Sequence, residues 1–125
     1  MDCIAVGDSI AVGIGQAAHC TINAKVGAGS SFIAGHTISI HKDVAVISAG
    51  SNDPSNSNLS KNLEKIRSKI RASTIIWVLP YNRKAAMIVK SVANRHGDRY
   101  IDLASVKTND GVHPSSYMSL VKRIW

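Results

Sequence analysis

Short apolar runs alternate with longer segments of helical spacing from one end of the chain to the other. Each run is only a few residues long, and most are closed by glycine, proline or a polar turn, which is typical of a buried β-strand. Such runs predict strands over residues 3–6, 21–26, 43–48, 74–79 and 100–103.

The segments between these runs carry apolar residues at helical spacing. Small and apolar residues predict a helix over 9–19, although Gly13 and Gly15 weaken it, and a helix led by proline is expected over 114–124. Two further helices have clearer apolar stripes. These stripes are Leu59, Leu63, Ile66 and Ile70 in one helix, and Ala85, Ile88, Val89, Val92 and Ala93 in the other, which Gly97 ends.

Strands that alternate with helices favour a parallel sheet covered on both faces. Because there is no internal repeat, low-complexity segment or linker, residues 1–125 are interpreted as one domain. The predicted fold class is α/β, a three-layer α/β/α sandwich around a five-stranded parallel sheet with the flavodoxin-like order 2-1-3-4-5.

The composition fits a globular protein of this size. Of the 125 residues, 45% are hydrophobic, and no apolar run is long enough to span a membrane. The first residues lack a basic stretch and Asp8 interrupts their apolar run, so we expect no signal peptide and synthesis in the cytoplasm. The final location stays open, and the small size is compatible with a phage-associated protein.

Positive charge is the strongest bias in the composition. The formal net charge is +7 and the isoelectric point is about 9.7, which favours attraction to anionic partners. Basic residues gather in the helix predicted from residue 59, which is either an ordinary solvated face or a surface that attracts anions. Aromatic residues make up only 5% of the chain, so no specific nucleic-acid partner is expected. The basic residues are Lys61, Lys65, Arg67, Lys69 and Arg71, opposed by Glu64 alone.

Two cysteines, Cys3 and Cys20, lie beside predicted strands and are interpreted as buried free thiols, with a disulfide as the less favoured alternative. Neither they nor the scattered histidines show the ligand spacing of a metal site. A G-x-G-x-x-A pattern over 13–18 lies inside a predicted helix rather than at a strand exit, which argues against dinucleotide binding. No metal and no organic cofactor is therefore expected.

Reactive side chains follow the predicted strands. Ser9 follows the first strand, Gly27 the second and Asn52 the third. Asp110 and His113 lie in the loop beyond the fifth strand. In a sheet of the predicted order, the carboxyl ends of these strands meet near the point where strand order reverses. The set contains a nucleophile, a base, an orienting carboxylate and hydrogen-bond donors, which are the parts of an acyl-transfer site.

The same segments resemble the sequence blocks of the GDSL/SGNH hydrolases. Residues 7–10 (GDSI) resemble block I, and residues 26–31 (VGAGSS) resemble block II. Residues 50–53 (GSND) match the GxND pattern of block III, and residues 110–114 (DGVHP) match the DxxH pattern of block V. The blocks occur in the family's order across nearly the whole chain. Within block I, we expect Ser9 to cap the following helix and Asp8 to hold the turn by local hydrogen bonds.

This resemblance implies an esterase with a serine nucleophile. It suggests Ser9 as the nucleophile, His113 as the base and Asp110 as the carboxylate that orients the base. An oxyanion hole is also implied, because the tetrahedral intermediate needs preorganised donors. The implied donors are the backbone N–H of Ser9, the backbone N–H of Gly27, with Ala28 as the alternative, and the side chain of Asn52.

The chain is short for this family, which leaves little surface to line a long lipid channel. We therefore expect a serine esterase that hydrolyses a short-acyl ester through an acyl-serine intermediate, and acetyl on a carbohydrate is the leading hypothesis for the substrate. The alternative is a non-catalytic module that binds a glycan or another anion on the same fold, such as a virion or cell-surface component.

Overall fold

A five-stranded parallel sheet forms the centre of the computed structural model, which describes residues 2–125. The strands lie in the order β2-β1-β3-β4-β5, and every pair is parallel, so the predicted order is confirmed. The strands are β1 (Cys3–Gly7), β2 (Thr21–Ala24), β3 (Ile40–Ser48), β4 (Ile70–Leu79) and β5 (Arg99–Asp102).

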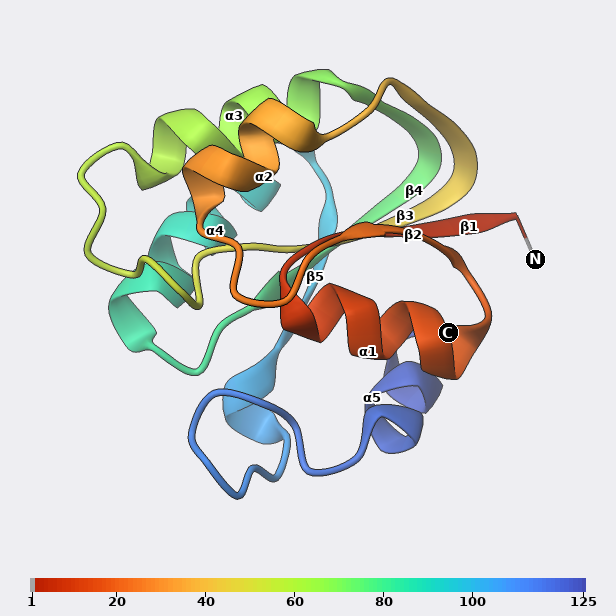
Figure 1. Ribbon diagram of the computed structural model, residues 1–125, viewed down its shortest axis with the longest axis vertical. Helices are drawn as coiled ribbons and strands as arrows, with labels where there is room; N and C mark the ends of the chain where they lie inside the picture. The colour runs from red at the N-terminus through yellow and green to blue at the C-terminus, as the bar shows by residue number, and fades with distance from the viewer. Residues whose placement is uncertain (1) are drawn as a thin grey trace.

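Helices cover both faces of the sheet, which gives the predicted three layers (Figure 1). On one face lie α1 (Ser9–Ala18) and α5 (Tyr117–Ile124), and a short 3₁₀ helix (Leu103–Ser105) packs into the same core. On the other face lie α2 (Ser30–His36), α3 (Leu59–Ser68) and α4 (Arg83–His96).

Strand residues alternate between these two cores. Val46 and Ile76 pack with Ile10 of α1 and Leu120 of α5, whereas Ile47 packs with the opposite core. Burial on both faces explains why β1 and the ends of β3 and β4 read as continuous apolar runs.

The predicted elements differ from the structure mainly at their ends. The sequence predicted no element between residue 31 and residue 43, yet α2 and the start of β3 occupy this region. Ile70 was assigned to a helical stripe, but it is the first residue of β4 and pairs in register with Ile40. The last helix begins at Tyr117 rather than Pro114, because the Ser116 hydroxyl accepts a hydrogen bond from the Ser119 N–H and caps it.

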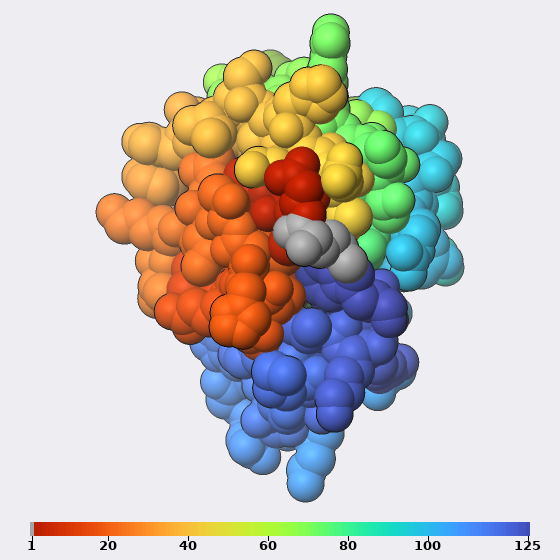
Figure 2. All heavy atoms as spheres, turned by 90° about the vertical axis from the view of Figure 1, so that its right-hand side faces the viewer, coloured from red at the N-terminus to blue at the C-terminus, as the bar shows by residue number. Residues whose placement is uncertain are grey.

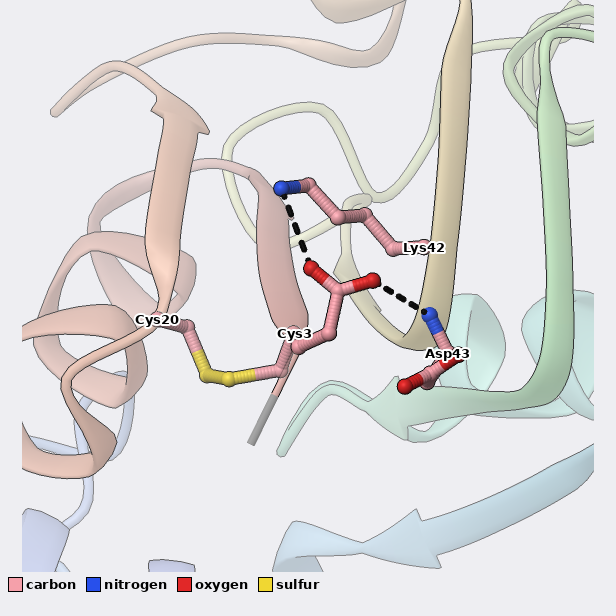
Figure 3. The surroundings of a disulfide bond; sticks show 5 residues. Cys3, Cys20, Lys42 and Asp43 are labelled. Atoms are coloured by element: carbon pink, nitrogen blue, oxygen red, sulfur yellow. Dashed lines mark hydrogen bonds and ion pairs between the residues drawn. A yellow bond between two sulfur atoms is a disulfide. The ribbon is translucent and has the colours of Figure 1, made fainter.

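The prediction of free cysteine thiols is wrong, because Cys3 and Cys20 form a disulfide (Figure 3). Their Cα atoms are 5.0 Å apart, and no free cysteine remains in residues 2–125. The parallel pairing of β1 with β2 brings them together, since Ile4 lies opposite Thr21 and each cysteine comes one residue earlier. A helix between two adjacent parallel strands returns the chain to the same edge, so the two strand starts become neighbours.

The edge at which the strands begin is called here the amino edge. Next to the disulfide, the Asp2 carboxylate accepts a hydrogen bond from the Asp43 N–H at 3.2 Å and pairs with Lys42 at 3.2 Å (Figure 3). Figure 2 faces this edge and shows the start of β1, in red, among the segments that lead into β2 and β3. The amino edge is therefore tied across β1, β2 and β3 by one covalent bond and one ion pair.

The basic helix is shorter than the sequence predicted. Helix α3 ends at Ser68, Lys69 donates to the Ala34 carbonyl at 2.5 Å, and Arg71 belongs to β4. The side chain of Arg67 was expected to point to solvent, but it forms an ion pair with Asp98 at 2.8 Å and is only 21% exposed. Only Lys61 and Lys65 of the predicted cluster remain exposed on the helix.

Candidate active site

The strands end at the opposite side of the sheet, called here the carboxyl edge, and the predicted site residues lie there. Gly7 pairs in register with Ala24 on one side and with Ser48 on the other. The segments that follow β1, β2 and β3 therefore leave the sheet side by side. Ser9 is the first residue of α1, and the loop between the 3₁₀ helix and α5 brings His113 to it.

The turn from β1 into α1 requires glycine at position 7. Gly7 has a φ of +137°, and a Cβ atom at this position would lie 1.7 Å from the carbonyl oxygen of Ser48. The next N–H, that of Asp8, donates to the same oxygen at 3.1 Å. No L side chain fits this approach, and the close contact fixes where Ser9 stands relative to β3.

Asp8 caps α1, so the expectation that Ser9 is the cap is wrong. The Oδ1 atom of Asp8 accepts a hydrogen bond from the Ile10 N–H at 3.0 Å, which is the local bond expected for this residue. Asp8 is better placed because it precedes the first helical residue, and its carboxylate is favourable at a helix N-terminus. The Ser9 hydroxyl is consequently not used in capping.

The Asp8 carboxylate is fully buried. Burial raises the pKa of Asp8 to about 6, while the Ser48 hydroxyl and the N–H groups of Ile10 and Ala11 act in the opposite direction. Its second oxygen, Oδ2, and the Ser48 hydroxyl have no partner with hydrogen-bond geometry in the described part of the chain. Asp8 is thus a buried titratable group in the turn from β1 into α1, one residue before Ser9.

Ser9, His113 and Asp110 form a continuous line of hydrogen-bonding groups. The Ser9 Oγ lies 2.8 Å from Nε2 of His113, and Nδ1 of the same ring lies 2.8 Å from Oδ2 of Asp110. The His113 side chain is 40% exposed and the Asp110 side chain 56% exposed. The structure therefore brings these three predicted residues together at an open surface.

The loop that carries Asp110 and His113 is held by its own hydrogen bonds. The Oδ1 atom of Asp110 accepts from the N–H of His113 at 2.7 Å and from that of Val112 at 2.8 Å. Thr108 donates its hydroxyl to the His113 carbonyl at 2.6 Å and accepts from the Gly111 N–H at 3.0 Å. Thr108 was not singled out from the sequence, because a lone threonine two residues before the motif gives no signal.

These contacts also set the charge of Asp110. The backbone N–H of His113, and then its side chain, hold the pKa of the Asp110 carboxyl well below its ordinary value. A carboxylate that stays ionised beside Nδ1 favours the ring tautomer with its proton on Nδ1. Nε2, which faces Ser9, is then the basic nitrogen.

The block II turn and Asn52 meet beside the nucleophile loop. The Asn52 side chain donates through Nδ2 to the Ala28 carbonyl at 2.9 Å, which orients its amide. The Ala28 N–H donates to the Lys25 carbonyl at 3.2 Å, whereas the Gly27 N–H forms no hydrogen bond within residues 2–125. Of the two alternatives left open by the sequence, the geometry favours Gly27 as an available donor.

Asp53 ties this turn to the loop after β3. Its carboxylate accepts from the Ser30 N–H at 3.0 and 3.1 Å and from the Ser30 hydroxyl at 2.5 Å. Asn62 of α3 donates in turn to the Ser30 hydroxyl at 3.0 Å. The sequence identified Asp53 only as the last residue of block III, and its structural partner in block II could not be predicted from spacing.

Three hollows surround this edge. One of about 300 Å³ lies between the loops after β3 and β4 and the loop of His113, with Ser51, Tyr81 and Val112 in its wall. Two others, of about 250 and 190 Å³, lie beside β2 and α2 and share Lys25 and Phe32 as lining residues. Among residues 2–125, no helix is long and apolar enough to cross a membrane, and no group of three or more metal-ligating side chains is found.

No family model matches the chain, and no curated protein matches its sequence. Among solved structures, the chain is similar to the crystal structure of Est24, a carbohydrate acetylesterase from Sinorhizobium meliloti. The likeness covers 98% of this chain and 97% of that one with a TM-score of 0.62, at 12% sequence identity. At this identity the likeness shows that the two chains share a fold.

Proposed function

We propose that this chain is a small serine esterase of the SGNH/GDSL type. The observation that carries the proposal is the pair of 2.8 Å contacts that joins Ser9 to His113 and His113 to Asp110. A serine hydroxyl becomes a nucleophile when a base in hydrogen-bond reach takes its proton and a third group orients that base. The four sequence blocks and an esterase as structural neighbour support the same function.

In the proposed first half-reaction, the Ser9 Oγ attacks the ester carbonyl while its proton passes to Nε2 of His113. Asp110 stays ionised and stabilises the imidazolium through Nδ1. The tetrahedral intermediate then collapses, the bond to the alcohol oxygen breaks, and the alcohol takes the proton from Nε2. The result is an acyl-Ser9 ester and a free alcohol.

In the second half-reaction, a water molecule gives its proton to Nε2 of His113 and attacks the acyl-Ser9 carbonyl. The carboxylic acid leaves, and Ser9 regains its proton from the imidazolium. His113 and Asp110 are partly exposed, so the base is open to the solvent that supplies this water. The proposed reaction uses only the ester, one water molecule and these three residues, and it needs no cofactor.

The proposed oxyanion hole consists of the N–H groups of Ser9 and Gly27 and the amide of Asn52. Ser9 begins a helix of ten residues, so its N–H lies at the positive end of a helix dipole. The Gly27 N–H donates to no carbonyl within residues 2–125, and the Ala28 carbonyl holds the Asn52 amide in place. Such donors, fixed before the reaction, stabilise the negative charge that develops on the carbonyl oxygen.

The proposed substrate is a short-acyl ester, with acetyl on a carbohydrate as the leading candidate. The hollow beside the His113 loop measures only about 300 Å³ and is open, which suits a small acyl group better than a long chain. The shared fold with a carbohydrate acetylesterase is in keeping with this choice.

A hydrolysis panel tests the proposal. We expect kcat/KM to fall from the acetyl to the butyryl and octanoyl nitrophenyl esters, and Ser9→Ala to reduce the rate on the acetyl ester by about 10⁴-fold or more. Ser91→Ala, an exposed serine on α4, is the matched control and should leave the rate unchanged. Equal rates for wild type and Ser9→Ala would overturn the esterase proposal in favour of a non-catalytic binding module.

A further inference from the structure

We propose that the two hollows lined by Lys25 and Phe32 bind the sugar part of the substrate, and that Lys25 selects a sugar that carries a negative charge. This inference rests on the proposed esterase function and names the substrate class of that same site. The chemistry recognised is an anionic group, a carboxylate or a phosphate, on the alcohol side of the ester.

Lys25 stands next to the nucleophile loop. It follows β2 directly, and its N–H donates to the Gly7 carbonyl at 3.0 Å, two residues before Ser9. The larger hollow has Gly7 in its wall, and the smaller one has Gly27 of the proposed oxyanion hole. Lys25 and Phe32 line both hollows, which reach the nucleophile loop at Gly7 and the proposed oxyanion hole at Gly27.

The side chains around Lys25 are held in order before any ligand binds. The ammonium group of Lys25 lies 5.0 Å from the centre of the Phe32 ring, within the range of a cation–π contact. The Phe32 and His36 rings stack with centroids 3.8 Å apart and planes 11° from parallel. His36 is fixed by its Nδ1, which lies 2.9 Å from the Phe32 carbonyl oxygen. Side chains that are already ordered lose little entropy when they bind a ligand.

Lys25 also has an unsatisfied charge. Among residues 2–125 the Lys25 ammonium group forms no ion pair, as is true of most lysines of this chain, and it lies over the Phe32 ring. The chain as a whole has 15 lysine and arginine residues against 8 acidic ones. A cation without a partner, placed beside the proposed oxyanion hole and backed by aromatic rings, fits an anionic sugar better than a neutral one.

The test compares sugar esters that differ only in charge. The probes are a methyl glucoside with one acetyl group, the matching glucuronoside with a carboxylate at C6, and the matching glucoside 6-phosphate, each assayed by acetate release. We expect wild type to have a kcat/KM about fivefold higher for at least one anionic probe than for the neutral one, which corresponds to about 1 kcal/mol. The two anionic arms show whether the carboxylate or the phosphate is preferred.

Lys25→Gln should reduce this anionic-to-neutral ratio to about one, and Lys25→Glu should invert it. Lys90→Gln is the matched control, since Lys90 also lies over an aromatic ring, 5.5 Å from the centre of Tyr100, but on α4 and β5. The anionic-to-neutral ratio of kcat/KM for Lys90→Gln should equal that of wild type. Salt should shrink the wild-type ratio, because exposed charges are screened over about 8 Å at physiological ionic strength.

The outcomes separate the two proposals. If wild type hydrolyses the probes in a Ser9-dependent way but shows no preference for charge, or if Lys25→Gln keeps the preference, the inference about Lys25 is wrong and the esterase proposal stands. If no probe and no nitrophenyl ester is hydrolysed, the esterase proposal fails, and the substrate inference fails with it.

Discussion

The two edges of the sheet are held together by different kinds of contact. At the amino edge, a disulfide joins β1 to the residue before β2, and Asp2 pairs with Lys42 of β3. At the carboxyl edge, the loops are held by non-covalent contacts, such as the hydrogen bonds of Asp53 with Ser30 and the ion pair of Arg83 with Asp102. The reactive groups occur at the second edge and the covalent tie at the first.

This difference indicates a division of roles within one small chain. The disulfide constrains the unit β1–α1–β2, which carries Ser9, without coming near the loops that would contact a substrate. The hydrogen-bonded loops, in turn, leave the N–H of Gly27 and the ring of His113 available. We therefore expect substitutions at the carboxyl edge to lower the rate and substitutions at the amino edge to lower stability.

The largest effect is expected for Asp110→Asn. The change removes the ionised carboxylate beside Nδ1 of His113 and allows the wrong ring tautomer, so kcat/KM on an acetyl ester should fall by about 10⁴-fold. The melting temperature should change little, because the side chain is 56% exposed. A rate within tenfold of wild type would show that Asp110 does not orient the base.

Gly7→Ala is the expected exception to this division of roles. Gly7 lies at the carboxyl edge, yet its substitution should lower the stability of the fold. Its new Cβ would meet the Ser48 carbonyl oxygen, so we expect a loss of about 4 kcal/mol or a failure to fold. Gly27→Ala is the matched control. Gly27 also has a positive φ, of +80°, but open space around it, so the loss there should be only about 1–2 kcal/mol. Urea denaturation measures both, and equal losses would contradict the steric argument at Gly7.

The disulfide should matter for stability and hardly for rate. Replacing both Cys3 and Cys20 by serine opens a loop with a sequence separation of 17 residues, for which chain entropy predicts a loss of about 3 kcal/mol. Because the bond lies at the amino edge, kcat/KM at a temperature well below unfolding should stay within about twofold of wild type. A variant of unchanged stability but low activity would reverse the roles assigned to the two edges.

The smallest effect is a pH dependence of stability at Asp8. The folded chain keeps the Asp8 proton up to a pKa of about 6, whereas the unfolded chain loses it near 3.8. Between these values the folded state binds more protons, so this residue makes stability fall as pH rises through that window. Asp8→Asn lacks the effect and keeps a helix-capping side chain. The melting temperature of wild type relative to Asp8→Asn should therefore drop between pH 4 and 7, and a constant difference would contradict the raised pKa.

Much of the fold could be predicted because the strands are short, apolar and separated by clear turns. Ile47 and Trp77 lie in buried strands that any reading of the hydrophobic pattern finds. The seven-residue helix α2 was missed because so few residues give little helical periodicity. The disulfide was missed for another reason. A sequence separation of 17 residues does not show that two cysteines are close, and only the pairing of β1 with β2 brings them together.

In the candidate site, too, the sequence alone does not predict contacts that depend on how separate segments fold together. Ser9, Asp110 and His113 could be singled out because each belongs to a motif that follows a strand. The sequence favoured Gly27 over Ala28 as the proposed donor, and the hydrogen bond from Ala28 to Lys25, which supports this preference, depends on the fold of the turn. The contact of Lys25 with the Phe32 ring had no sequence signal, because six residues separate the two along the chain and no motif contains both.

The most direct measurement is covalent labelling of the nucleophile. Wild-type protein treated with an organophosphonate should gain one adduct, and peptide mass spectrometry should place it on Ser9. His113→Ala should slow the labelling, because the base 2.8 Å from the hydroxyl is lost, and Ser9→Ala should abolish it. An adduct on another serine, or no adduct while the protein remains folded, would contradict the assignment of Ser9 as an activated nucleophile.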